Sequence, residues 1–101
     1  RLTFRSKYRA ADIDIKKSSS VPGALFEISK SDEKKLDVYE DFPKLYKKYY
    51  FNYYGKKVMT YTMTKKSSFK FPTERYLSIV TQGYSDCELD MKYLKRALKN
   101  N

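Results

Sequence analysis

The chain has 101 residues, of which 41% are hydrophobic and 17% aromatic, and its formal net charge is +10. That length suits a single domain, and that apolar content is typical of a folded protein rather than a disordered one. Because histidine is absent and Cys87 is the single cysteine, the sequence excludes a disulfide within the chain, excludes a His-activated nucleophile and argues against a zinc site.

The first two expected strands alternate apolar and polar residues. Arg1–Ser6 places Leu2 and Phe4 on one face, and a short connection leads to a second alternating stretch, Ala10–Lys16. In the second stretch we expect apolar side chains to face inward and acidic ones to face water, which sets Ala11, Ile13 and Ile15 against Asp12 and Asp14. Two carboxylates without further oxygen ligands make a poor cation site, so we expect no metal here.

A short apolar run and a capped helix follow. Ala24–Ile28 predicts a short, buried third strand. Ser29 is a typical N-cap, and Asp32 three residues later approximates a capping box. Pro43 cannot continue a helix, so the helix is expected to end near Glu40.

The second half of the chain predicts a long hairpin and two helices. Leu45–Tyr54 and Lys57–Thr64 are strand-like, and a tight turn at Gly55-Lys56 joins them. Two C-terminal helices are then expected, with caps or ends at the following residues: Thr73, Gly83 and Asp90. The element order predicts an α+β fold of about five antiparallel-leaning strands with one intervening helix and two C-terminal helices, in a single domain.

Glu40 stands at the junction between the expected first helix and the aromatic strand. Leu36 and Tyr39 lie on one face of that helix, and Tyr39 and Tyr46 flank the acid in sequence. A carboxyl group in a partly apolar pocket can act as a proton-transfer base, because desolvation raises its pKa. The residues alone leave open the alternative of a solvent-facing glutamate at a helix end, which is the common state of this residue type.

Five short motifs occur in a distinctive order. They are V-P-G-A-L-F-E-I-S at Val21–Ser29, L-D-V-Y-E at Leu36–Glu40, P-K-L-Y at Pro43–Tyr46, T-Y-T-M at Thr60–Met63 and E-R-Y-L-S-I-V-T-Q-G at Glu74–Gly83. In order and spacing the chain resembles the γ-glutamyl cyclotransferase-like family, which includes the AIG2-like proteins. The resemblance covers nearly the whole chain.

The resemblance implies a fold, an activity and three site residues. The fold is a small mixed or antiparallel β-barrel, and the activity is cyclisation of a small γ-glutamyl amine to 5-oxoproline without a metal or a cofactor. The family's catalytic acid/base, the Glu of L-D-x-x-E, corresponds to Glu40. The family's pocket tyrosines correspond to Tyr46 and Tyr61, which implies that both contact substrate.

The chain departs from the family pattern in two places. The family's N-terminal Y-G-S-N-L strand and loop, which holds the γ-glutamyl part of the substrate, has no match, so we expect residues 1–101 to be an N-terminally truncated domain. Asp41 stands where the family usually has Gly directly after the catalytic Glu.

Two other functions remain open. One is a non-catalytic module of the same fold that binds a small metabolite or a protein. The other is a basic nucleic-acid binder, although the lysines are scattered and no recognised motif is present, so we expect no specific nucleic acid. The single cysteine and the lack of a long apolar run predict a cytoplasmic protein without a membrane anchor. An open sheet edge can drive homodimerisation, and the sequence leaves both the monomer and the homodimer open.

Overall fold

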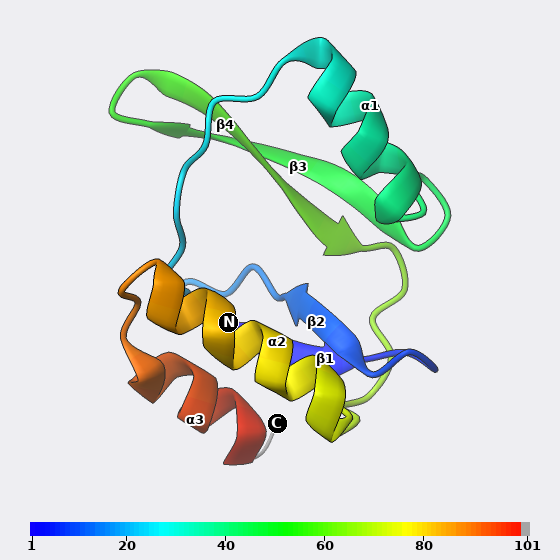
Figure 1. Ribbon diagram of the computed structural model, residues 1–101, viewed down its shortest axis with the longest axis vertical. Coiled ribbons are helices and arrows are strands. Elements are labelled where there is room, and N and C mark those ends of the chain that lie inside the picture. The colour runs from blue at the N-terminus through cyan, green and yellow to red at the C-terminus, as the bar shows by residue number, and fades with distance from the viewer. Residues whose placement is uncertain (100–101) are drawn as a thin grey trace. The chain divides into compact units, whose positions relative to one another are not determined.

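The computed structural model describes residues 1–99 (Figure 1). Its architecture is α+β, with two antiparallel two-stranded sheets and three helices in that part of the chain. The chain forms two compact units, one from residues 1–25 together with the stretch after Lys66, and one from Phe26–Lys66. The single domain expected over residues 1–101 stays a prediction, and its last two residues lie outside the described part.

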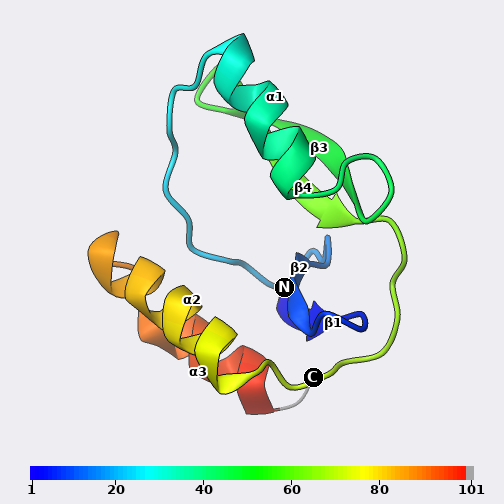
Figure 2. The same ribbon diagram turned by 45° about the vertical axis from the view of Figure 1, so that its right-hand side comes forward.

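The first unit packs a short hairpin against two helices. Strand β1 (Leu2–Arg5) pairs with β2 (Ala10–Ile13), and helices α2 (Glu74–Asp86) and α3 (Met91–Lys99) lie side by side in both views (Figure 2). Its core is a cluster of buried apolar side chains from β1 and the two helices: Leu2, Phe4, Tyr84, Leu94 and Ala97. Burial of these side chains from water provides the main stabilisation of the unit.

The facing expected for the second strand is wrong at its acidic positions. Asp12 is only 2% exposed, whereas Ile15 is 64% exposed. The reason is Arg5 on the neighbouring strand, itself buried, whose guanidinium lies 3.4 Å from the Asp12 carboxylate and 2.9 Å from that of Asp14. A buried carboxylate is tolerated when it is paired, so β2 is covered on both faces: Ala11 packs against the core cluster, and Asp12 is buried beside Arg5.

The expected helix starts are confirmed. The Ser29 hydroxyl accepts the Asp32 backbone N–H at 3.0 Å, and the Asp32 carboxylate accepts the Ser29 N–H at 3.2 Å, which completes a capping box on α1 (Lys30–Tyr39). Thr73 accepts the Tyr76 N–H at 3.2 Å at the start of α2. Asp90 accepts the Lys92 N–H at 2.9 Å at the start of α3.

The expected end of the second helix at Gly83 is wrong. Helix α2 continues through Gly83 to Asp86 and ends in a Schellman motif. In that motif Glu88 adopts a left-handed conformation (φ 54°), and the Leu89 N–H donates to the Tyr84 carbonyl at 2.8 Å. The hydrophobic Leu89 also packs against the core cluster, which fixes the stop three residues beyond the glycine.

The second unit consists of α1 and a long hairpin. Strand β3 (Tyr46–Tyr53) pairs with β4 (Lys56–Met63), with Tyr46 opposite Met63 and Lys48 opposite Tyr61. The connecting turn is Tyr54-Gly55, with φ of 47° and 77°, the positive values that a two-residue type I′ turn requires. The turn therefore lies one residue earlier than expected.

The third strand expected at Ala24–Ile28 is not formed, since residues 14–29 contain no helix or strand. Leu25 is 59% exposed and Phe26 is 76% exposed, and no sheet of the described residues takes up their backbone hydrogen bonds. An apolar run becomes a strand only where a neighbouring strand pairs with it. The described residues accordingly form two separate sheets and no closed barrel, so the barrel stays a prediction.

Candidate functional site

The C-terminus of α1 carries Glu40. This residue is the C-cap, and its backbone N–H donates to the Leu36 carbonyl at 2.8 Å. The two following N–H groups close a Schellman motif: Asp41 donates to the Val38 carbonyl at 3.2 Å, and Phe42 donates to the Asp37 carbonyl at 2.9 Å. The backbone on both sides of Glu40 is therefore held by hydrogen bonds rather than by chain connectivity alone.

Asp41 adopts the left-handed conformation in this motif, with φ of 52°. This C′ position is where helices most often place glycine, because glycine has no Cβ to clash there. The position directly after Glu40 is thus one where the backbone favours glycine. Asp41 supplies the same turn at a cost in backbone strain.

Glu40 is half-buried, and removal of water by burial raises the pKa of its carboxyl group above the usual range. This direction is the one that a general acid/base operating near neutral pH requires. Of the two tyrosines that flank Glu40 in the sequence, only one is buried. Tyr46 is buried at 8% exposure, whereas Tyr39 is 82% exposed and does not shield the carboxyl.

The hairpin holds α1 through a polar cluster next to Glu40. Lys48 Nζ lies 2.6 Å from the Glu33 carboxylate and 3.0 Å from the Asp37 carboxylate. The Tyr61 hydroxyl donates to Oδ1 of the same Asp37 carboxylate at 2.6 Å. We call these four residues, Glu33, Asp37, Lys48 and Tyr61, the α1 clamp.

Charge and hydrogen bonding shift the titration of the clamp. The Tyr61 hydrogen bond, followed by the contacts with Lys48, lowers the pKa of the Asp37 carboxyl. The hydrogen bonds to Glu33 and Asp37 raise the pKa of the Lys48 ammonium, and desolvation together with the Asp37 hydrogen bond raises the pKa of the Tyr61 phenol. At neutral pH Asp37 is therefore a carboxylate, Lys48 an ammonium and Tyr61 a neutral phenol.

Two of the three residues predicted for the site, Tyr46 and Tyr61, lie on the face of the hairpin that holds α1, and the third, Glu40, ends that helix. Tyr46 and Lys48 share a face of β3, and Tyr61 lies on the same face of β4 because it is opposite Lys48. That face holds α1 through Asp37, and Glu40 follows Asp37 by three residues on the same side of the helix. The roles of Tyr46 and Tyr61 in substrate contact stay predictions.

Sequence reasoning missed the clamp. It placed Leu36 and Tyr39 on one face of the first helix, and the structure shows that α1 has no buried side chain and that Leu36 is 37% exposed. The available signal was the spacing of the acids: Glu33 and Asp37 are four residues apart and so share a helix face. The strand that follows this helix in the sequence contains Lys47 and Lys48, which are possible partners for the two acids.

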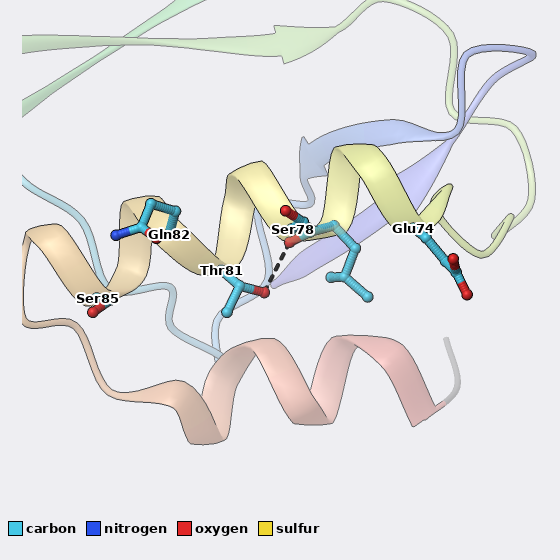
Figure 3. A pocket seen from close by; sticks show the side chains of 6 residues that line it. Glu74, Ser78, Thr81, Gln82 and Ser85 are labelled. Carbon is cyan, nitrogen blue, oxygen red and sulfur yellow. Dashed lines mark hydrogen bonds between the residues drawn. The ribbon is translucent and has the colours of Figure 1, made fainter.

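A separate hollow lies along α2 in the first unit (Figure 3). Its lining residues all belong to that helix: Glu74, Leu77, Ser78, Thr81, Gln82 and Ser85. The Thr81 hydroxyl donates to the Leu77 carbonyl at 2.8 Å, and the Gln82 amide donates to Asp86 at 2.8 Å. These polar groups are engaged within their own helix, so the hollow does not gather the convergent donors that define a ligand site.

Among residues 1–99, no group of three or more acidic or cysteine side chains is arranged to hold a metal ion. None of the helices described has both the length and the hydropathy needed to cross a bilayer. Comparison of the chain with protein-family models, with curated proteins and with solved structures finds no match.

Proposed function

We propose that this is a γ-glutamyl cyclotransferase-like protein that converts a small γ-glutamyl amine to 5-oxoproline, with Glu40 as the general acid/base. The observation that carries the proposal is the half-buried Glu40 carboxyl, whose pKa is raised by desolvation, in a turn fixed by a Schellman motif. The order of the five sequence motifs supports the same assignment. The proposal also includes the family's β-barrel fold.

The reaction needs one proton-transfer group and a folded substrate. The Glu40 carboxylate takes a proton from the substrate's α-ammonium, and the freed amine attacks the γ-carbonyl carbon of the same molecule. The resulting tetrahedral centre collapses with cleavage of the original γ-amide C–N bond, and Glu40 returns the proton to the departing nitrogen. The attacking nitrogen loses its second proton, again through Glu40, to the released amine. One C–N bond forms and one breaks, so the products are 5-oxoproline and the amine in its ammonium form.

The side chains present are adequate for this chemistry. Holding the amine against the carbonyl contributes up to about 7–11 kcal/mol through proximity. A positioned general base contributes roughly 10²–10⁴-fold in rate. In this proposal Tyr46, which is buried and shares a face of β3 with Lys48, supplies an apolar wall with a polar tip, which suits the methylene chain of a γ-glutamyl group.

The test is release of 5-oxoproline by the whole natural protein. Candidate substrates are γ-glutamyl α-amino acids, γ-glutamyl-ε-lysine and γ-glutamyl polyamines, which differ only in the leaving amine. Glu40→Gln is expected to abolish turnover and to leave the fold unchanged. Glu27→Gln, at an exposed glutamate outside the helix, is the matched control and is expected to keep the full rate.

Two outcomes separate this proposal from the binding module of the same fold. Turnover by the unmodified protein that is lost only in Glu40→Gln supports the enzyme. A γ-glutamyl dipeptide that raises the melting temperature without release of 5-oxoproline from any substrate supports the binding module and contradicts the enzyme.

A further inference from the structure

Lys48 contacts the chain on both sides of Glu40. Its ammonium lies 3.0 Å from the carboxylate of Asp37, which precedes Glu40 by three residues. The same ammonium lies 4.6 Å from the centroid of the Phe42 ring, which follows Glu40 by two residues. A cation over an aromatic face is a favourable contact, so the Lys48 side chain of β3 contacts both the end of α1 and the turn that follows it.

Asp37 links the hairpin to the turn through two different groups. Its carboxylate accepts the Tyr61 hydroxyl from β4 at 2.6 Å and the Lys48 ammonium from β3. Its backbone carbonyl accepts the Phe42 N–H at 2.9 Å, the bond that closes the Schellman motif around Glu40. A displacement of Asp37 is therefore transmitted directly to the backbone that carries Glu40.

Apolar packing does not replace the clamp. Helix α1 has no buried side chain, whereas Lys48 has a side chain only 14% exposed and Asp37 one only 23% exposed. The best-shielded contacts between the helix and the hairpin are thus ionic and hydrogen-bonded. Such contacts have narrow geometric requirements, which makes them suited to fixing an orientation.

We infer that Lys48 and Tyr61, acting through Asp37, are positioning residues that hold Glu40 in its productive place. The expected effect on kcat rests on the proposed function. The expected effect on the position of Glu40 does not depend on turnover. It also assigns Tyr61 a role other than the substrate contact that the resemblance implies. The Tyr61 hydroxyl is engaged with Asp37, and it acts on the substrate only through the orientation of Glu40.

The geometric arm is an NMR comparison of four variants of the whole protein. Lys48→Met and Tyr61→Phe remove the two hairpin contacts with Asp37. Lys47→Met and Tyr49→Phe are matched controls, because both side chains lie on the opposite face of β3 and are exposed. We expect the backbone amides of Glu40 and Phe42 to shift in the first pair and to stay in place in the controls.

The titration of Glu40 gives a second readout. Glu33, Asp37 and Glu40 share one helix face, Asp41 follows directly, and Lys48 is the cation that the hairpin presents to that face. Lys48→Met therefore leaves uncompensated carboxylates beside Glu40 and is expected to raise its pKa. Unchanged Glu40 and Phe42 amides together with an unchanged titration, in both Lys48→Met and Tyr61→Phe, overturn the inference.

The kinetic arm measures kcat and KM for 5-oxoproline release. A misplaced base lowers the rate of the chemical step, so kcat is expected to fall roughly tenfold to a hundredfold while KM changes little. Lys48→Arg keeps the cation and is expected to restore most of the lost rate. Full kcat in a Lys48→Met variant that folds normally overturns the inference. If the NMR changes occur and no substrate is turned over by the unmodified protein, the proposed function fails and the clamp stands.

Discussion

The left-handed backbone at Asp41 gives a prediction that does not depend on the chemistry. Asp41→Gly places a residue without Cβ at φ 52° while keeping both Schellman hydrogen bonds, which involve only backbone atoms. An L-residue in the left-handed region costs roughly 1–2 kcal/mol, which glycine avoids. Glycine also raises the conformational entropy of the unfolded chain, and this effect cancels about 0.4–1 kcal/mol of the gain in folding free energy. The net stabilisation expected is therefore about 0.5–1 kcal/mol.

The assay is thermal or urea unfolding of the variant beside the unmodified protein. A gain of that size corresponds to a rise in melting temperature of about 2–8 °C for a unit of this length. Asp41→Asn is the matched control and is expected to change little, because asparagine also tolerates this conformation, whereas Asp41→Val is expected to destabilise. A lower melting temperature for Asp41→Gly would refute the assignment of a left-handed cap and with it the turn that carries Glu40.

Three further changes test other parts of the account. Arg5→Met removes the guanidinium that lies 3.4 Å from the buried Asp12 carboxylate and is expected to cost about 3–5 kcal/mol in urea unfolding, most of it recovered by adding Asp12→Asn; an unaffected stability would contradict the ion pair. Because the folded-state pKa of Asp37 is lowered from 3.8, its contribution to stability is present above that pH and is lost as the pH falls through the folded value. The free energy of unfolding of Asp37→Asn is therefore expected to fall less steeply with decreasing pH than that of the unmodified protein. Identical pH dependence in the two proteins would count against the clamp. Tyr54→Asn places the residue preferred in a type I′ turn at φ 47° and is expected to raise the melting temperature, whereas a fall would argue against that turn.

Local signals in the sequence predicted the elements that have local causes. The capping residues Ser29, Thr73 and Asp90 determine where helices begin through hydrogen bonds that span two or three residues, so their positions could be read from the chain. The hairpin from Tyr46 to Met63 was predictable for the same reason, since its turn and its alternation are both local.

The features that were missed depend on partners distant in sequence. The burial of Asp12 depends on Arg5 on another strand, and alternation of apolar residues alone cannot reveal that ion pair. The end of α2 beyond Gly83 depends on Leu89 packing into a core built from three elements. The clamp combines Asp37 with Lys48 and Tyr61 from two strands, so only the spacing of its acids could be seen in advance.

The dependence of the rate of 5-oxoproline release on pH tests the central claim most directly. With Glu40 as the base, kcat/KM rises with pH along a limb whose midpoint lies above 4.5, the ordinary glutamate value, because burial raises the pKa of Glu40. The account predicts that this limb and the activity itself disappear together in Glu40→Gln. Release at an undiminished rate, with the same limb, in Glu40→Gln would contradict it.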